Sequence, residues 1–245
     1  MLLVALSGEA LRVVVVTGGP CSGKTSTIDS LEGVTRVPEA ATLYHRAGGQ
    51  LPFSHNQPDR DLLWEAWLVE LKISLENAAI ARGGLVVCDR GVLDSRAYVD
   101  DWPRLLELLD TSQQELEARY DAVVHLDVAP PDAYSLGNAA RTESYTQAVA
   151  LGEQTLASWR GPIPMTRVRN TGSFNDKIRT ARSAVLAASK ITSHRRGRKV
   201  VQVPPSVIIA RANRLATAAD LDRVYPNSLR ALRRIQDARR ALVVT

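Results

Sequence analysis

The sequence predicts an α/β fold in which a five-stranded parallel sheet is flanked by helices. Two observations lead to this class. Short runs of apolar, β-branched residues alternate with longer segments of helical periodicity, and glycines or prolines separate many of these segments. A chain of 245 residues suits one such domain with an appendage, and it is long enough to bury a core without disulfides.

Each expected strand is a short apolar run, and the clearest is the first, RVVVVT, which ends at a glycine pair. A run of this kind is typical of a strand buried on both faces of a parallel sheet. Strands are expected at residues 12–17, 34–37, 85–88, 122–126 and 166–169.

The expected helices lie between these strands, and the longest ends at the pair Gly83 and Gly84. Two segments rich in glycine, proline or polar residues, 40–59 and 129–145, are expected to be loops, and the second is expected to be mobile. Helices are expected at residues 25–31, 59–81, 103–119, 145–159 and 175–189.

Composition excludes several classes of protein. Only Cys21 and Cys88 are available for disulfides, which argues against a secreted disulfide framework and favours a reducing, cytoplasmic location. No apolar run approaches the ~18–20 residues that a membrane span needs, so no membrane span is expected.

The net charge of +5 is unevenly distributed along the chain. Residues 191–245 hold eleven arginines and one lysine against three aspartates, a net charge of +9, which leaves −4 for residues 1–190. We therefore expect two parts, a nucleotide-binding domain at 1–190 and a basic C-terminal extension at 191–245 with an amphipathic helix near 227–242. Docking on the acidic body, dimerisation and nucleic-acid binding are alternative roles for this extension.

The string GGPCSGKT at residues 18–25 carries the most specific chemistry. It matches G-x-x-x-x-G-K-[ST] between an expected strand and an expected helix, the context in which a phosphate-binding loop works. Lys24 is expected to reach the β- and γ-phosphates, and the Thr25 hydroxyl to ligate Mg²⁺. The residues expected to contact the nucleotide are Gly18, Gly19, Pro20, Cys21, Ser22, Gly23, Lys24, Thr25 and Ser26.

Two expected strands end in an aspartate, Asp89 and Asp127, and either carboxylate could serve the metal at the carboxyl edge of the sheet. We favour Asp89 for Mg²⁺, because an Asp-Arg pair beside the phosphate-loop strand is typical of P-loop kinases, and Arg90 for the phosphoryl group or the acceptor. Asp127 is equally well explained as a turn residue at a strand end.

An ordered set of motifs resembles a known family: GGPCSGKTS, then VPEAA at 37–41, GGQLPF at 48–53, CDRGVLDSRAY at 88–98, NAARTES at 138–144 and WRGPIPMTRVRN at 159–170. The set is similar to the AAA-type P-loop family that includes NadR-like kinases and the nucleotide-binding domain of the TRPL translocation defect protein. The resemblance covers about residues 12–190 and does not extend to the basic extension.

The resemblance implies a kinase-like P-loop NTPase fold with a lid, in which Arg141 matches the lid arginine that clamps phosphates. Pairing of Arg141 with Glu143 on a solvated helix start is the alternative. Glu39 is either the base that accepts a proton from an acceptor hydroxyl, a role that Asp89 could also take, or the cap of the next helix, where a carboxylate favours the N-terminus. Asn170 either contacts the base or ribose of the nucleotide or caps the turn before Ser173.

The function that these motifs favour is an ATP-dependent phosphotransferase that uses Mg²⁺ and a small polar acceptor, such as a nucleoside. The chain lacks the N-K-x-D motif that reads guanine in GTPase switches, which argues against a GTPase switch. The choice between adenine and guanine stays open, so GTP is the alternative donor. A regulatory nucleotide-binding protein with little transfer activity and a nucleic-acid-end kinase that grips its substrate through the extension are the alternative functions.

Overall fold

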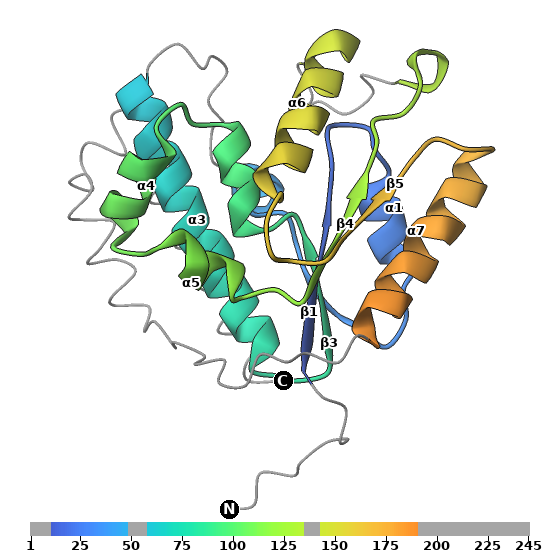
Figure 1. Cartoon of the computed structure of the whole chain (residues 1–245), viewed down its shortest axis with the longest axis horizontal. Coiled ribbons are helices and arrows are strands. Elements are labelled where there is room, and N and C mark those ends of the chain that lie inside the picture. The colour runs from blue at the N-terminus through green and yellow to red at the C-terminus, as the bar shows by residue number, and fades with distance from the viewer. Residues whose placement is uncertain (1–10, 49–57, 135–142, 191–245) are drawn as a thin grey trace, which may run out of the picture.

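The computed structural model describes residues 11–48, 58–134 and 143–190, and it confirms the α/β class. A five-stranded parallel sheet has the order β2-β3-β1-β4-β5. Helices cover both of its faces (Figure 1). The strands are β1 (Arg12–Thr17), β2 (Thr35–Val37), β3 (Leu85–Asp89), β4 (Ala122–Leu126) and β5 (Met165–Val168).

Nine helical segments connect the strands within the described residues. They are α1 (Lys24–Asp29), α2 (Ala40–Arg46), α3 (Pro58–Ile80), the 3₁₀ turn η1 (Val92–Ala97), α4 (Trp102–Leu109), α5 (Gln113–Glu117), the 3₁₀ turn η2 (Pro131–Ala133), α6 (Tyr145–Ser158) and α7 (Phe174–Ser189).

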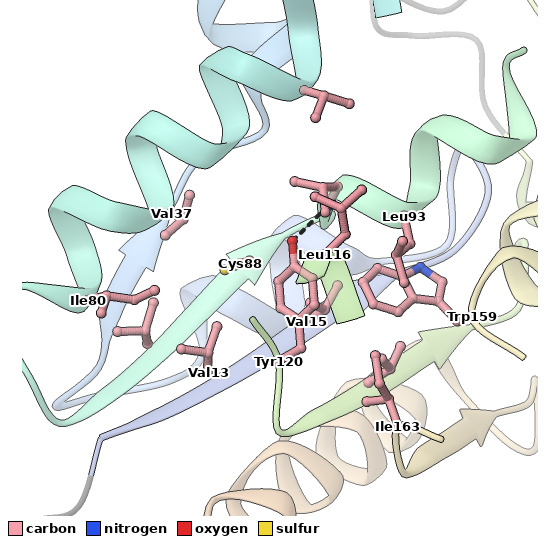
Figure 2. Packing of buried hydrophobic residues seen from close by; sticks show 14 of the residues in the cluster. Val13, Val15, Val37, Ile80, Cys88, Leu93, Leu116, Tyr120, Trp159 and Ile163 are labelled. Atoms are coloured by element: carbon pink, nitrogen blue, oxygen red, sulfur yellow. Dashed lines mark hydrogen bonds between the residues drawn. The ribbon is translucent and has the colours of Figure 1, made fainter. Parts of the chain in front are cut away.

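The strands divide their side chains between two cores. Val13, Val15 and Cys88 lie on the face covered by α3, η1, α4, α5 and the residues after α6, where Tyr120 and Trp159 fill the core (Figure 2). Val14 and Val16 face α1 and α7. Because side chains alternate along a strand and both faces are covered, the four consecutive valines of β1 are all fully buried.

Two expectations about local structure were wrong. The segment expected to be a loop begins with α2, because Tyr44 packs against Trp64 and Trp67 of α3, with its ring centroid 5.0 and 4.8 Å from theirs. The helix expected at 103–119 is two helices, since Asp110 adopts a left-handed conformation with φ of 50° and ends α4.

Candidate nucleotide-binding site

The phosphate loop joins β1 to α1, and its glycines are required by close contacts. Gly18 has φ of +138°, and a Cβ there would lie 2.1 Å from the Leu126 carbonyl oxygen of β4. A Cβ at Gly19 would lie 2.7 Å from the Ala148 carbonyl oxygen of α6. Positive φ values also occur at Cys21 and Gly23, so the loop curls tightly before α1 begins. Pro20 and Ser22 complete this turn, and Ser26 is exposed in the first turn of α1.

Lys24 is folded back over the phosphate loop. Its Nζ donates to the Gly18 and Gly19 carbonyl oxygens at 3.0 and 2.8 Å and to the Ser22 hydroxyl at 3.3 Å. Burial, assisted by the positive charge of Arg90, lowers the pKa of Lys24 to about 8 against the opposing pull of nearby carboxylates. A phosphate in the loop would offer this buried ammonium full charges in place of carbonyl dipoles.

Asp89 and Thr25, the two residues predicted to hold a metal, meet beside the loop. Asp89 ends β3 opposite Val16 of β1, and its Oδ2 accepts a hydrogen bond from the Thr25 hydroxyl at 3.3 Å. Its Oδ1 is buried and has no hydrogen-bond partner within the described residues. Burial raises the pKa of Asp89 to about 6, although Lys24 opposes the shift. A buried carboxylate oxygen without a partner beside a hydroxyl fits Mg²⁺, which prefers oxygen ligands and shares them with nucleotide phosphates.

Arg90 and Glu39 form an ion pair at the same edge of the sheet. Arg90 Nε lies 2.6 Å from Glu39 Oε1, and the two side chains are 10% and 27% exposed. Arg90 has φ of 67°, a conformation that costs a residue with a Cβ about 1 kcal/mol. Its Nη1 is buried without a hydrogen-bond partner in the described part of the chain.

The ion pair also determines the contacts of the Glu39 carboxylate. Glu39 occupies the position before α2, but its side chain makes no capping bond to the backbone and instead accepts from the Thr42 hydroxyl at 2.6 Å and from Arg90. Burial would raise the pKa of Glu39, but Arg90 and Lys24 outweigh it and lower this pKa to about 2.

The structure places Asn170 and Asp127 at the ends of β5 and β4. Asn170 Nδ2 donates to the Val128 carbonyl oxygen at 2.6 Å, so it joins the two strand ends, and Ser173 caps α7 by itself. Asp127 accepts from Arg167 Nε at 2.7 Å, which agrees with a structural role at the strand end. Contact of Asn170 with a nucleotide stays a prediction.

Two further expectations stay predictions. Arg141 lies outside the described residues, so its role as a lid arginine stays a prediction, as does the division of the chain at residue 190. Trp64 and Trp67 pack in the core of the α2–α3 pair. No helix in the described ranges is long and apolar enough to cross a membrane.

Sequence reasoning did not single out Asp94, a buried carboxylate beside this site. It is fully buried in η1, and its carboxylate contacts the last residue of β1 and the loop that carries Asp89 and Arg90. The run VLDSRA lacks a period that would have identified its aspartate as buried. The signal that could have found it is its place in the motif CDRGVLDSRAY, five residues after Asp89.

The glycine-lined loop, the buried lysine and the Asp89–Thr25 pair define a P-loop nucleotide-binding domain. A family model described as AAA domain matches residues 13–177, and the chain belongs to this family. No curated protein matches the chain significantly. The comparison confirms the AAA-type P-loop part of the resemblance and leaves its narrower, NadR-like part as a prediction.

Proposed function

We propose that the protein is a phosphotransferase that moves the terminal phosphoryl group of ATP, with GTP as the alternative donor, to a hydroxyl of a small polar acceptor. One observation carries this proposal. Asp89 Oδ1 and Arg90 Nη1 are buried polar atoms on adjacent residues, and neither has a hydrogen-bond partner within the described chain. Buried polar atoms are normally paired. The first of these two would accept a cation and the second would donate to an anion, so a metal-bound phosphoryl group satisfies both.

The phosphate loop supplies the binding part of this function. Lys24 would exchange the loop carbonyls for phosphate oxygens, and the backbone N–H groups at the start of α1 would be available to the same anion. Thr25 and Asp89 would hold Mg²⁺, which when bound supplies charge stabilisation to the phosphate oxygens. These residues fix the donor before any acceptor enters.

Arg90 and Glu39 supply the transfer part. A pKa near 2 makes Glu39 a poor base while it is paired with Arg90. When a phosphoryl group draws the Arg90 guanidinium toward itself, Glu39 loses the partner that lowers its pKa and becomes able to accept the proton of an acceptor hydroxyl. Arg90 then neutralises charge on the transferring group, a role that can be worth ~10³-fold in rate.

A cavity of about 900 Å³ between α3, the η1–α4 segment and α6 is our candidate for the acceptor site. Tyr98 lines it and also interacts with the charges of Arg90 and Glu39, which connects the cavity to the phosphoryl site. Acidic side chains outnumber basic ones on its wall, and Arg104 is already paired with Glu107 at 2.9 Å. This charge balance favours a neutral or cationic alcohol, such as a nucleoside, over a phosphorylated acceptor. The charged lining residues are Asp61, Asp100, Asp101, Glu143, Arg96 and Arg104.

The narrower family placement belongs to this proposal. A NadR-like kinase domain would use Arg141 as a lid arginine over the phosphates, and the basic extension at 191–245 would lie outside the catalytic domain. A regulatory nucleotide-binding role and a nucleic-acid-end kinase are the alternatives that the following experiment separates.

The purified protein is incubated with Mg·ATP or Mg·GTP and a panel of nucleosides, other small alcohols and oligonucleotides, and products are identified by mass. A phosphorylated small alcohol that Lys24→Ala does not make supports the proposal. Tight nucleotide binding without transfer to any acceptor favours the regulatory role, and phosphorylation of oligonucleotides alone favours the nucleic-acid-end kinase.

A further inference from the structure

Asp94 is a carboxylate that binds three donors from three separate parts of the chain. Its side chain is 0% exposed. Oδ1 accepts from the Thr17 hydroxyl at 2.5 Å and from the Trp159 indole N–H at 3.0 Å, and Oδ2 accepts from the Gly91 backbone N–H at 2.8 Å. We call this group the Asp94 cluster; it consists of Thr17, Gly91, Asp94 and Trp159.

Two of these donors belong to the segments that carry the site. Thr17 ends β1 and directly precedes Gly18, the first residue of the phosphate loop. Gly91 directly follows Arg90, whose left-handed backbone is unfavourable without an anchor on either side. The Arg90 N–H is fixed to the Val16 carbonyl oxygen at 3.0 Å, and Asp94 fixes the next residue. Asp94 therefore fixes the position of the Asp89–Arg90 segment relative to the phosphate loop.

The third donor, the indole N–H of Trp159, connects the Asp94 cluster to α6. Trp159 is 1% exposed and ends this helix, and its ring lies so close to Gly91 that a Cβ there would be 2.6 Å from it. Tyr120 packs against the same ring with a centroid separation of 5.2 Å (Figure 2). Toward its other end, α6 contacts the phosphate loop, where Ala148 and Gly152 approach Gly19. The helix thus contacts the phosphate loop directly and the metal-binding segment through Asp94.

We propose that Asp94 is a positioning residue, which sets the Asp89–Arg90 segment relative to the phosphate loop and α6 so that metal and nucleotide bind cooperatively. This inference rests on the metal site of the proposed function. Asp94 touches neither nucleotide nor metal and acts through Gly91 and Thr17.

An amide cannot reproduce the contacts of this carboxylate. Asn at position 94 has one acceptor oxygen and one donor nitrogen, whereas the Gly91 N–H and the Trp159 indole N–H are both fixed donors on opposite oxygens. Asp94→Asn therefore sets a donor against a donor at one of them while it keeps the size of the side chain. Trp159→Phe removes one donor and keeps most of the ring, which makes it the milder variant.

The experiment measures the ATP dissociation constant of the full chain by calorimetry, with excess Mg²⁺ and with EDTA, for wild type, Asp94→Asn, Trp159→Phe and the double variant. The ratio of the two constants reports metal coupling. We expect Asp94→Asn to reduce this ratio about tenfold, as loss of a group that orients a metal ligand does, with a small change in EDTA. Trp159→Phe should reduce it less, and the double variant should resemble Asp94→Asn. Asp110→Asn, on an exposed left-handed residue that asparagine tolerates, is the matched control.

A purely structural role for Asp94 would lower the melting temperature and weaken ATP binding equally with and without Mg²⁺, and that result overturns the inference. An unchanged ratio in Trp159→Phe overturns it where Asp94→Asn does not fold. The proposed function fails separately: a wild-type protein that transfers phosphate to no acceptor, yet loses metal coupling in Asp94→Asn, refutes the kinase and leaves the positioning role in place.

Discussion

Replacing Glu39 by Gln tests the ion pair at the centre of the site. A carboxyl whose pKa falls from 4.5 to about 2 on folding stabilises the folded state by about 3 kcal/mol at neutral pH. Solvent screens part of this, because 27% of the Glu39 side chain is exposed. We therefore expect Glu39→Gln to lower the free energy of unfolding by about 2 kcal/mol at pH 7.

The stabilisation by Glu39 depends on pH and is lost in acid. Because the folded pKa lies below the unfolded one, the stabilisation is complete above about pH 5 and disappears as the pH falls toward 2. Urea unfolding at about pH 7, 5, 4 and 3 should thus show the difference between wild type and Glu39→Gln shrinking as the pH falls below about 5. Glu107→Gln, which removes an exposed ion pair, should cost less than about 0.5 kcal/mol. A difference between wild type and Glu39→Gln that persists unchanged at pH 3 would refute the reasoning.

Three other substitutions test the packing and charge around the site. Gly19→Ala forces a methyl group against the Val128 side chain and the Ala148 carbonyl oxygen, and it should lower stability by about 1–3 kcal/mol and weaken ATP binding, as read by urea unfolding and calorimetry. Lys24→Ala should raise the ATP dissociation constant at least about tenfold in calorimetry, because the phosphates lose a charged donor. The circular dichroism spectrum should stay unchanged, because among the described residues Nζ donates only within the phosphate loop. Glu76→Gln breaks a buried ion pair with Arg119 and should lower the free energy of unfolding by about 3 kcal/mol in urea unfolding. An equally large loss in Glu107→Gln, which breaks an exposed pair, would contradict the claim that burial makes the Glu76 pair important.

The sheet was predictable from the sequence because its signal is local. The valine run of β1 and the apolar runs of β3 and β4 are buried on both faces, so hydrophobicity and β-branching identify them without any knowledge of their neighbours. The phosphate loop was predictable for a related reason. A tight phosphate-binding turn needs residues with positive φ, which glycine adopts most easily, and the sequence has Gly18 and Gly23 there. The φ values of both residues are positive.

Elements that depend on tertiary contacts were harder to predict. The helix α2 lies in a segment whose glycines and prolines indicate a loop. It forms because Tyr44 packs against the tryptophans of α3. The break between α4 and α5 had a local signal that was overlooked, since Ser112 and Glu115 form a capping box that starts α5.

The candidate site was predicted in its parts and not in its connections. The sequence indicated Lys24, Thr25 and Asp89 through motif spacing, and the structure brings Thr25 and Asp89 within 3.3 Å. The pairing of Glu39 with Arg90 joins residues 51 positions apart, and no local pattern records it. Glu39 occupies the position before α2 that the capping alternative gave it, but Arg90 and Thr42 hold its carboxylate and it makes no capping bond to the backbone.

The measurement that tests the central claim most directly compares Arg90→Lys with wild type. Lysine keeps a positive charge for Glu39 and removes the unpartnered Nη1. ADP affinity is measured by calorimetry and ATP turnover with the best acceptor of the panel, or hydrolysis where no acceptor works. We predict that Arg90→Lys binds ADP within about threefold of wild type and turns over ATP ~10³-fold more slowly. Turnover that stays near the wild-type rate would contradict the claim that Arg90 serves the transferring phosphoryl group.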